Sequence, residues 1–255
     1  MQEFKSLEYI ETGKLAVLKL NRPEKRNALN KEMIGELTDL FTYLQENEDV
    51  VLLQIVGKGD VFCAGADISW LTQLKDSPLE VVKEEFLSLA EMLKKLYGLP
   101  QVVFTFVHGS AFGGALGIMA CSDFVLSSPK TVFSFSEINL GLIPATISPF
   151  VVNKIGKAQA KKLFFSGDKF NEDKAVEIGL VDQVPQASPG ALKYETLMET
   201  VLKKPHHALK AMKELFRGME SGDITINNQE NSGELIAGLI KSEETQELFE
   251  RFLTK

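Results

Sequence analysis

The sequence predicts an α/β fold built around a parallel sheet, and three observations support this class. Short, nearly continuous apolar runs occur at residues 15–21, 50–57 and 101–109, as in strands that are covered on both faces. Segments with helical periodicity separate these runs. The last third of the chain is mostly helical. Alternating strands and helices indicate βαβ units, whereas the helical end argues against a barrel that continues to the C-terminus.

The first half of the chain supplies two of these strands and two long helices. A charged loop at 22–26 follows the first strand, and Asn30 is expected to cap a helix over residues 31–47. A loop at 58–68 follows the second strand, and an amphipathic helix is expected at about 79–99. The apolar face of the first helix is formed by Met33, Ile34, Leu37, Leu40, Phe41 and Leu44.

The second half begins with the third strand and a glycine pair. Gly113 and Gly114 follow this strand and lead into a short apolar helix. Farther along, the pattern becomes mostly helical, and Gly179 is expected to end one of the helices. Short strands are expected at 124–128 and 132–138, and helices at 156–167, 172–184, 191–205 and 234–255.

Composition and charge fit one large globular domain with a helical appendage. The 255 residues are 44% hydrophobic, and the formal net charge is −7, which disfavours nucleic acid and anionic membranes as partners. No signal peptide or transmembrane run is recognisable, so we expect a cytoplasmic protein. Cys63 and Cys121 lie in apolar surroundings without metal-ligand spacing. We therefore expect free, buried thiols and no metal site.

Two stretches of small residues, 64-AGADI-68 and 112-FGGAL-116, each follow a buried strand. Ligands of parallel sheets bind beyond the carboxyl ends of the strands, so both stretches should reach the same edge. Their backbone N–H groups could both bind one ligand oxygen and form an oxyanion hole. Taken alone, a glycine pair is more often explained by close packing of a strand on a helix. The GxGxxG and GxxxxGK motifs are absent, so phosphate binding by this loop is not expected.

Three motifs in this order, 62-FCAGADI-68, 107-VHGSAFGGALGIMACSD-123 and 133-FSFSEINLGLIP-144, resemble the crotonase (enoyl-CoA hydratase/isomerase) superfamily. The resemblance covers nearly the whole chain. It implies a ClpP/crotonase-like spiral of ββα units, with a core at 1–190 and a helical C-terminal region at 191–255 for trimerisation or as a lid. It also implies an enzyme that binds acyl-CoA thioesters and stabilises a thioester enolate. Coenzyme A would be part of the substrate with no separate cofactor, and the assembly would be a homotrimer or a dimer of trimers.

The same resemblance implies roles for individual residues. The backbone N–H groups of Ala66 and Gly114 would form the oxyanion hole. Glu137 would exchange a proton with the substrate, because an apolar wall raises the pKa of a carboxyl group. Hydratases of this family generally carry a second glutamate at the position that Gly117 occupies here. His108 is expected to shape the glycine loop. Residues implied along the path of coenzyme A and the acyl group are Lys25, Arg26, Ala28, Ala64, Asp67, Ile68, Gly113 and Gly117.

The strings 113-GGALGIMACSD-123 and 136-SEINLGLIPATISPFVVNKIG-156 resemble bacterial methylglutaconyl-CoA hydratases. Their substrates, from leucine or terpene degradation, carry a distal carboxylate, and we expect hydration of a 3-methylglutaconyl-type thioester. One hypothesis is that this carboxylate helps to position the attacking water in space vacated at Gly117. An enoyl-CoA isomerase or a decarboxylase of the same superfamily is the alternative. A non-enzymatic thioester-binding or RNA-binding scaffold is disfavoured by Glu137 and by the acidic composition.

Overall fold

The computed structural model describes residues 4–185, 190–219 and 226–254. The chain forms two compact units, Met1–Leu202 and Lys203–Lys255. The predicted boundary at residue 190 assigns functions to two parts of the chain, a thioester-binding core and a trimerisation or lid region. This assignment stays a prediction. No helix among the described residues is long and apolar enough to cross a membrane.

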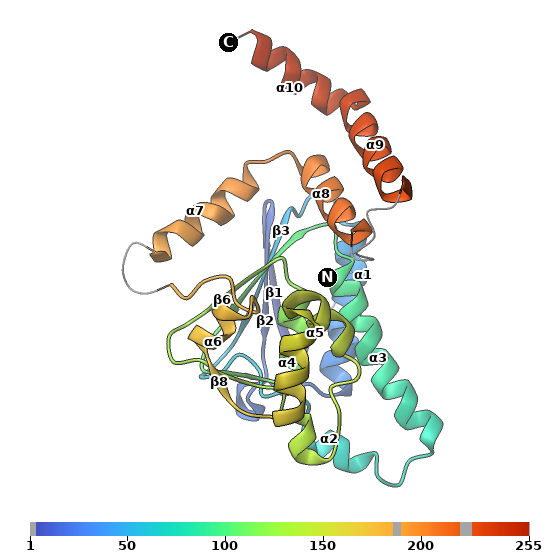
Figure 1. The fold of residues 1–255 in the computed structure, drawn as a ribbon, viewed down its shortest axis with the longest axis vertical. Coiled ribbons are helices and arrows are strands. Elements are labelled where there is room, and N and C mark those ends of the chain that lie inside the picture. Colours follow the sequence, from blue (N-terminus) through green and yellow to red (C-terminus); the bar gives the residue numbers. More distant parts are fainter. Residues whose placement is uncertain (1–3, 186–189, 220–225, 255) are drawn as a thin grey trace. The chain divides into compact units, whose positions relative to one another are not determined.

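The larger unit is built on a five-stranded sheet in the order β1-β2-β3-β4-β6 (Figure 1). Four of the strands are parallel, and they confirm the predicted α/β class. The first strand pairs with its neighbour in antiparallel fashion, and it was not predicted because its sequence, LEYIET, forms no continuous apolar run. The strands are β1 (Leu7–Thr12), β2 (Leu15–Leu20), β3 (Leu52–Gly57), β4 (Val102–Val107) and β6 (Phe124–Ser127).

Helices α1 (Lys31–Glu46) and α3 (Leu79–Tyr97) pack side by side (Figure 1). The predicted cap of α1 is confirmed, because the side chain of Asn30 accepts a hydrogen bond of 3.0 Å from the N–H of Met33. All six residues of the predicted apolar face of α1 are buried. Burial of that face holds the helix in place, since propensity alone rarely stabilises a helix of this length.

A smaller sheet lies beyond the main one and has the order β5-β7-β8. Strands β5 (Ser110–Phe112) and β8 (Phe170–Asn171) were not predicted, because two or three residues show no periodicity. The strand expected at 132–138 is wrong in its second half. Strand β7 (Val132–Ser134) gives way to a 3₁₀ helix at Ser136–Leu140, which ends at Gly141 with a φ of 73°.

The remaining helices differ from the predicted ranges at their ends. Helix α5 starts well before the predicted residue 156, and Gly156 forms a kink inside it with a φ of 77°. Gly179, with a φ of 77°, follows the end of α6 as expected. The single helix predicted at 234–255 is two helices, because Ser242 caps the second one. These helices are α2 (Ile68–Gln73), α4 (Gly114–Ala120), α5 (Ser148–Ser166), α6 (Glu172–Glu177), α7 (Gly190–Leu202), α8 (His206–Gly218), α9 (Ile226–Lys241) and α10 (Glu243–Leu253).

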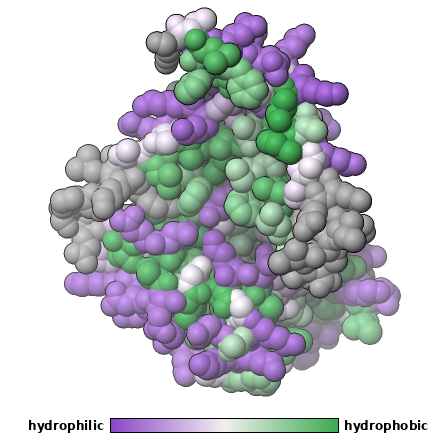
Figure 2. All heavy atoms as spheres, turned by 45° about the horizontal axis from the view of Figure 1, so that its top comes forward, coloured by the Kyte–Doolittle hydropathy of each residue, from purple (hydrophilic) through white to green (hydrophobic). Residues whose placement is uncertain are grey.

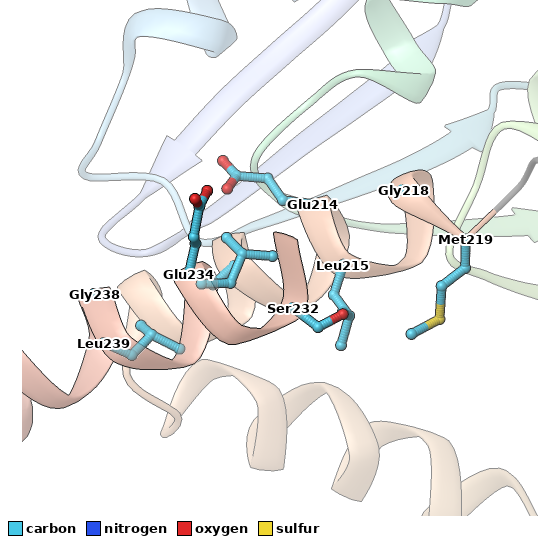
Figure 3. Close-up of a pocket in the computed structure, with 10 residues that line it drawn as sticks. Glu214, Leu215, Gly218, Met219, Ser232, Glu234, Gly238 and Leu239 are labelled. Carbon is cyan, nitrogen blue, oxygen red and sulfur yellow. The ribbon is translucent and has the colours of Figure 1, made fainter. Parts of the chain in front are cut away.

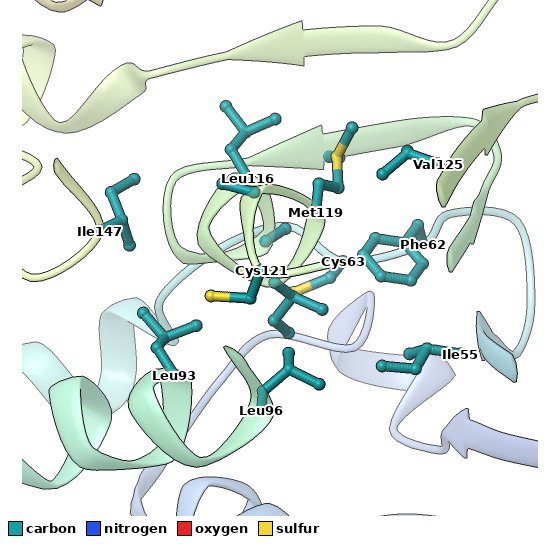
Figure 4. Packing of buried hydrophobic residues seen from close by; sticks show 14 of the residues in the cluster. Ile55, Phe62, Cys63, Leu93, Leu96, Leu116, Met119, Cys121, Val125 and Ile147 are labelled. Atoms are coloured by element: carbon teal, nitrogen blue, oxygen red, sulfur yellow. The ribbon is translucent and has the colours of Figure 1, made fainter. Parts of the chain in front are cut away.

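The hydrophobic core of the larger unit surrounds α4, every residue of which is buried. Figure 4 shows Leu93, Ile147 and Phe62 directed toward the segment that carries Leu116 and Met119. Both cysteines are free and buried, as predicted. Burial raises the pKa of the Cys63 thiol to about 12, so this group is an inert part of the core.

The C-terminal unit carries apolar side chains that were expected to be buried within the chain. Ile236 is 54% exposed, Phe252 81% and Leu253 83%, and Figure 2 shows green hydrophobic residues among purple hydrophilic ones on the face it displays. Exposed apolar surface of this kind is typical of regions that bind another protein chain. The expected trimer or hexamer stays a prediction. A hollow of about 500 Å³ also lies between α8 and α9, with Glu214 and Glu234 at its edge (Figure 3).

Candidate active site

Three segments that leave neighbouring strands β3, β4 and β6 run side by side, and together they deliver the candidate site. Cys63 pairs with Ala111 in an isolated parallel bridge, and Ala111 pairs with Phe133 in the smaller sheet. These two pairings fix the register of the three segments. A few residues further along each segment lie Ala66, Gly114 and Glu137.

The N–H of Ala66 is held in a fixed position but has no acceptor within the described part of the chain. On its two sides, the N–H of Leu29 donates to the carbonyl of Gly65 at 2.7 Å, and the N–H of Asp67 donates to the carbonyl of Leu29 at 2.8 Å. Gly65 has a φ of 90°, and a Cβ there would lie 2.8 Å from the carbonyl oxygen of Phe112. Only glycine fits at this turn.

Gly114 is the first residue of α4, so its N–H points out of the helix without an intrahelical partner. Its neighbour Gly113 is fixed by a hydrogen bond of 3.0 Å from its N–H to the carbonyl of Ser134. Gly113 has a φ of 51°, which favours glycine. The glycine pair therefore orients the Gly114 amide, and close packing is not its only role.

Ala66, Gly114 and Glu137 line one cavity of about 360 Å³. Among the described residues around this cavity, Glu137 is the only charged one. The two backbone N–H groups can polarise one carbonyl oxygen, and the apolar surroundings strengthen that interaction. The other lining residues are Leu29, Trp70, Leu71, Phe86, Leu89, Gly141, Leu142, Ile143, Pro144, Ala145, Thr146 and Ile147.

The carboxyl group of Glu137 is desolvated and lies over the glycine pair. Its Oε2 atom is buried and has no hydrogen-bond partner in the described chain. Its Oε1 atom lies 3.0 Å from where a Cβ on Gly113 would stand. Burial raises the pKa of Glu137, and a backbone hydrogen bond only partly opposes this effect, which confirms the predicted direction. A carboxyl group of this kind is suited to donate a proton near neutral pH.

The space expected beside Gly117 is filled, and the hypothesis of a vacated water site there is wrong. A Cβ on Gly117 would lie 2.6 Å from Cγ2 of Ile147 and 3.2 Å from Cδ1 of Leu93. Ile147 contributes to the cavity wall, whereas Gly117 is not among the residues that line it. The small residue at 117 therefore makes room for the isoleucine and leaves no hole.

The residues expected along the coenzyme A path surround the Ala66 segment and lie outside the cavity wall. Lys25 and Arg26 are exposed on a 3₁₀ turn, and the N–H of Ala64 donates to the carbonyl of Arg26 at 2.9 Å. Ala28 is buried, whereas Ile68 is 53% exposed. Their role toward coenzyme A stays a prediction.

Asp67 has a structural role that the sequence did not indicate. Its Oδ1 atom caps α2 by accepting from the N–H of Ser69 at 2.9 Å, and its Oδ2 atom pairs with Nη2 of Arg22 at 3.1 Å. Burial alone would raise the pKa of Asp67, but the hydrogen bonds from Arg22 and the α2 backbone lower it overall. Arg22, expected in the basic loop, also donates to the carbonyl of Ala28 at 2.6 Å.

The Nε2 atom of His108 lies 2.9 Å from the carbonyl oxygen of Gly59 in the loop after β3, so the expected role of His108 in shaping the glycine loop stays a prediction. Trp70 and Ile147 are wall residues that sequence reasoning missed. Trp70 follows 64-AGADI-68 directly on α2, and this adjacency was the available signal. No group of three or more potential metal ligands occurs among the residues that the structure describes.

Comparison with known proteins identifies the family. The model of the enoyl-CoA hydratase/isomerase family matches residues 11–255. A crotonyl-CoA hydratase of Syntrophomonas wolfei is 34% identical over 203 residues, which cover 78% of this chain and 76% of that protein.

Solved structures agree over nearly the whole chain. An enoyl-CoA hydratase from Shewanella pealeana has a TM-score of 0.94 at 29% identity, covering 99% of this chain and 94% of its own. Pseudomonas aeruginosa AtuE has a TM-score of 0.92 at 27% identity, covering 98% and 96%. The expected crotonase-like architecture is confirmed. The chain therefore belongs to the enoyl-CoA hydratase/isomerase (crotonase) family, whose members act on acyl-CoA thioesters.

Proposed function

We propose that the protein hydrates a 2-enoyl-CoA thioester, with 3-methylglutaconyl-type thioesters as the preferred class. One observation carries this proposal: two backbone N–H groups that have no acceptor among the described residues line the same apolar cavity as one desolvated carboxyl group. Resemblance of the segments at 113–123 and 136–156 to methylglutaconyl-CoA hydratases supports the acyl class.

In this mechanism the thioester oxygen accepts hydrogen bonds from the N–H groups of Ala66 and Gly114. As water adds to the β-carbon, the electron pair of the double bond moves toward the carbonyl, and the transition state gains enolate character. The two N–H groups bind the negative oxygen more strongly than the neutral one, which accelerates the step. Protonated Glu137 delivers its proton to the α-carbon.

The proton balance requires a base for the attacking water. In the same step, Glu137 gives its proton to the α-carbon through one carboxyl oxygen and takes a proton from the water through the other, so both additions occur on the same face. One carboxyl group then serves both transfers and returns to its starting state. Because Ile147 fills the space beside Gly117, the water has to lie elsewhere in the cavity.

Removal of one donor tests the oxyanion hole. Proline is tolerated at the first position of a helix, so Gly114→Pro deletes the N–H without breaking α4. The matched control is Gly114→Ala, which keeps the N–H and places the same Cβ 2.9 Å from Cδ1 of Leu29. We expect Gly114→Pro to lower kcat about 100- to 1000-fold relative to Gly114→Ala. Equal activity of the two variants would refute the role of this amide.

Isomerisation of a 3-enoyl to a 2-enoyl thioester is a second candidate. It is favoured by the single carboxyl group among the described cavity residues, because one carboxyl group suffices to move a proton between two carbons. The two activities have opposite signals in one absorbance assay. Hydration removes the conjugated thioester, whereas isomerisation creates it. Loss of absorbance from a 2-enoyl thioester, abolished by Glu137→Gln, supports hydration, and a rise from a 3-enoyl thioester alone supports isomerisation.

A further inference from the structure

The Ala66 amide is held by a bridge between two segments that lie outside the strands of both sheets. Leu29 and Ala66 pair in an isolated parallel bridge. Its two hydrogen bonds lie on either side of the Ala66 N–H, one from the N–H of Leu29 to the carbonyl of Gly65 and one from the N–H of Asp67 to the carbonyl of Leu29. Because the bridge is isolated, the direction of the Ala66 N–H depends on what else joins these two segments.

The guanidinium group of Arg22 joins them. Its Nη1 donates to the carbonyl oxygen of Ala28 at 2.6 Å, and its Nη2 donates to Oδ2 of Asp67 at 3.1 Å. Ala28 directly precedes Leu29, and Asp67 directly follows Ala66, so one planar group is bonded to both sides of the bridge. A guanidinium group suits this task, because its donors form a rigid fork that holds two acceptors in a fixed relative position.

Arg22 is itself anchored to the chain that leads to Ala66. Its backbone N–H donates to Oδ1 of Asn27 at 2.9 Å. Asn27 is fully buried, and its Nδ2 donates to three carbonyl groups of the loop after β3, at 2.8, 3.0 and 3.0 Å. The side chain of Arg22 is only 15% exposed, so solvent competes little for its two bonds. The arginine therefore holds the bridge from a fixed position.

We propose that Arg22 is a positioning residue of the oxyanion hole, which sets the direction of the Ala66 N–H through its bonds to Ala28 and Asp67. The inference rests on the proposed function, because it takes this N–H as a donor to the thioester oxygen. Arg22 is not among the described residues around the cavity, so it acts only through the bridge. A misdirected N–H loses more in the transition state, where the oxygen is negative, than in the bound substrate.

Two substitutions of Arg22 separate positioning from other roles. Arg22→Met removes both bonds, whereas Arg22→Lys keeps a cation near Asp67 but lacks the fork that reaches both acceptors. We expect both variants to lower kcat about 10- to 100-fold with little change in KM. A raised KM at unchanged kcat would mean that Arg22 binds the coenzyme A part of the substrate, and it would overturn the proposal. Wild-type kcat in Arg22→Lys would overturn it as well.

Lys19→Met is the control for the loss of a cation. Lys19 on β2 pairs with Glu8 on β1, and Glu8 keeps Lys58 as a second partner in the variant. This pair does not contact the bridge, so kcat should stay at the wild-type value. A fall in kcat as large as that in Arg22→Met would show that the Arg22 effect is not specific to the bridge.

Amide hydrogen exchange measures the bridge itself, without substrate. In Arg22→Lys, the Leu29 and Asp67 amides should lose more protection than the amides of β3, because loosening is then local and not a general loss of stability. Equal changes in the bridge and in β3, or no change in either, would contradict a positioning role.

The thioester carbonyl reports the result of that loosening. Butyryl-CoA is saturated and cannot be hydrated, so with ¹³C at its thioester carbonyl it gives a stable complex for infrared difference spectroscopy. The shift of the carbonyl stretch to lower frequency on binding should be smaller in Arg22→Lys than in wild type and Lys19→Met. The same shift in all three proteins would refute the inference.

The two proposals fail in different ways. If wild type hydrates 2-enoyl thioesters and Arg22→Lys retains its kcat and carbonyl shift, positioning by Arg22 is refuted while hydration stands. If wild type hydrates no 2-enoyl thioester, the proposed function is refuted. Hydrogen exchange and the carbonyl shift of bound butyryl-CoA then decide separately whether Arg22 directs the Ala66 amide.

Discussion

Substitution of Gly117 by alanine tests how the cavity wall is packed. Gly117 lies inside α4, and the structure fills the space beside it with Ile147. The family resemblance had indicated free space at this position. A filled space and a free space beside Gly117 predict opposite effects of Gly117→Ala on the free energy of unfolding.

The magnitude follows from two opposing contributions. Replacing glycine by alanine inside a helix stabilises a protein by up to about 1 kcal/mol. The new Cβ would lie 2.6 Å from Cγ2 and 3.1 Å from Cβ of Ile147, and overpacking of this kind costs about 1–3 kcal/mol. Rotation about χ1 would move Cγ2 but not Cβ of Ile147, which stays 3.1 Å from the new methyl group, so a rotamer change relieves the clash only in part. We therefore expect Gly117→Ala to lower the free energy of unfolding by about 1–2 kcal/mol.

The assay is urea unfolding of four variants. Gly35→Ala is the matched control, because Gly35 also lies inside a helix and a Cβ there would meet nothing within 4 Å; it should be stabilising. Ile147→Ala alone should cost about 2–5 kcal/mol. In that background Gly117→Ala should become stabilising, because the clashing Cγ2 atom is gone and the new methyl group partly fills the cavity.

One result refutes this account of the wall. If Gly117→Ala stabilises the wild-type protein as much as Gly35→Ala does, the space beside residue 117 is free. Additive effects of Gly117→Ala and Ile147→Ala would lead to the same conclusion, because residues in contact show a coupling energy.

Three further predictions concern the groups around the reaction centre. Gly113→Ala forces an unfavourable φ and brings a Cβ to 3.0 Å from Oε1 of Glu137, so steady-state kinetics should show kcat reduced by up to about 100-fold with a smaller change in KM; an unchanged kcat contradicts this. The folded-state pKa of Glu137 is raised, so the folded protein loses stability as pH rises from the ordinary glutamate range through that pKa. Glu137→Gln should therefore raise the free energy of unfolding more at neutral pH than at acidic pH. An equal effect at both pH values would contradict desolvation of the Glu137 carboxyl group. Arg22→Met leaves Asp67 buried without its cation and should cost about 3 kcal/mol in urea unfolding, whereas a loss below about 1 kcal/mol would mean that the pair is screened as on a surface.

The sequence predicted those parts of the fold whose pattern is local. Strands β2, β3 and β4 are apolar runs in which every residue is buried or half-buried, and α1 combines a clear apolar face with an asparagine cap. Short elements such as β5, β8 and α2 carry no comparable signal. The two strands form only because they pair with β7, and a single sequence does not show such pairing.

In the candidate site, too, the residues in local motifs were predictable and the contacts between distant elements were not. Ala66, Gly114 and Glu137 were found through motifs, and the structure places them around one cavity because three segments share a register. The contact between Gly117 and Ile147 joins residues from different elements, so no local pattern predicts it. The place of Trp70 in the cavity wall was missed for a related reason, because its neighbours in that wall come from distant parts of the sequence.

We propose that the amides of Ala66 and Gly114 polarise a thioester carbonyl. The most direct measurement is isotope-edited infrared difference spectroscopy of an acyl-CoA carrying ¹³C at the thioester carbonyl, bound to Gly114→Ala and to Gly114→Pro. We expect a carbonyl stretch at lower frequency in the bound state than in water, with part of this shift lost in Gly114→Pro. A bound stretch at the frequency found in water, or the same shift in both variants, would contradict it.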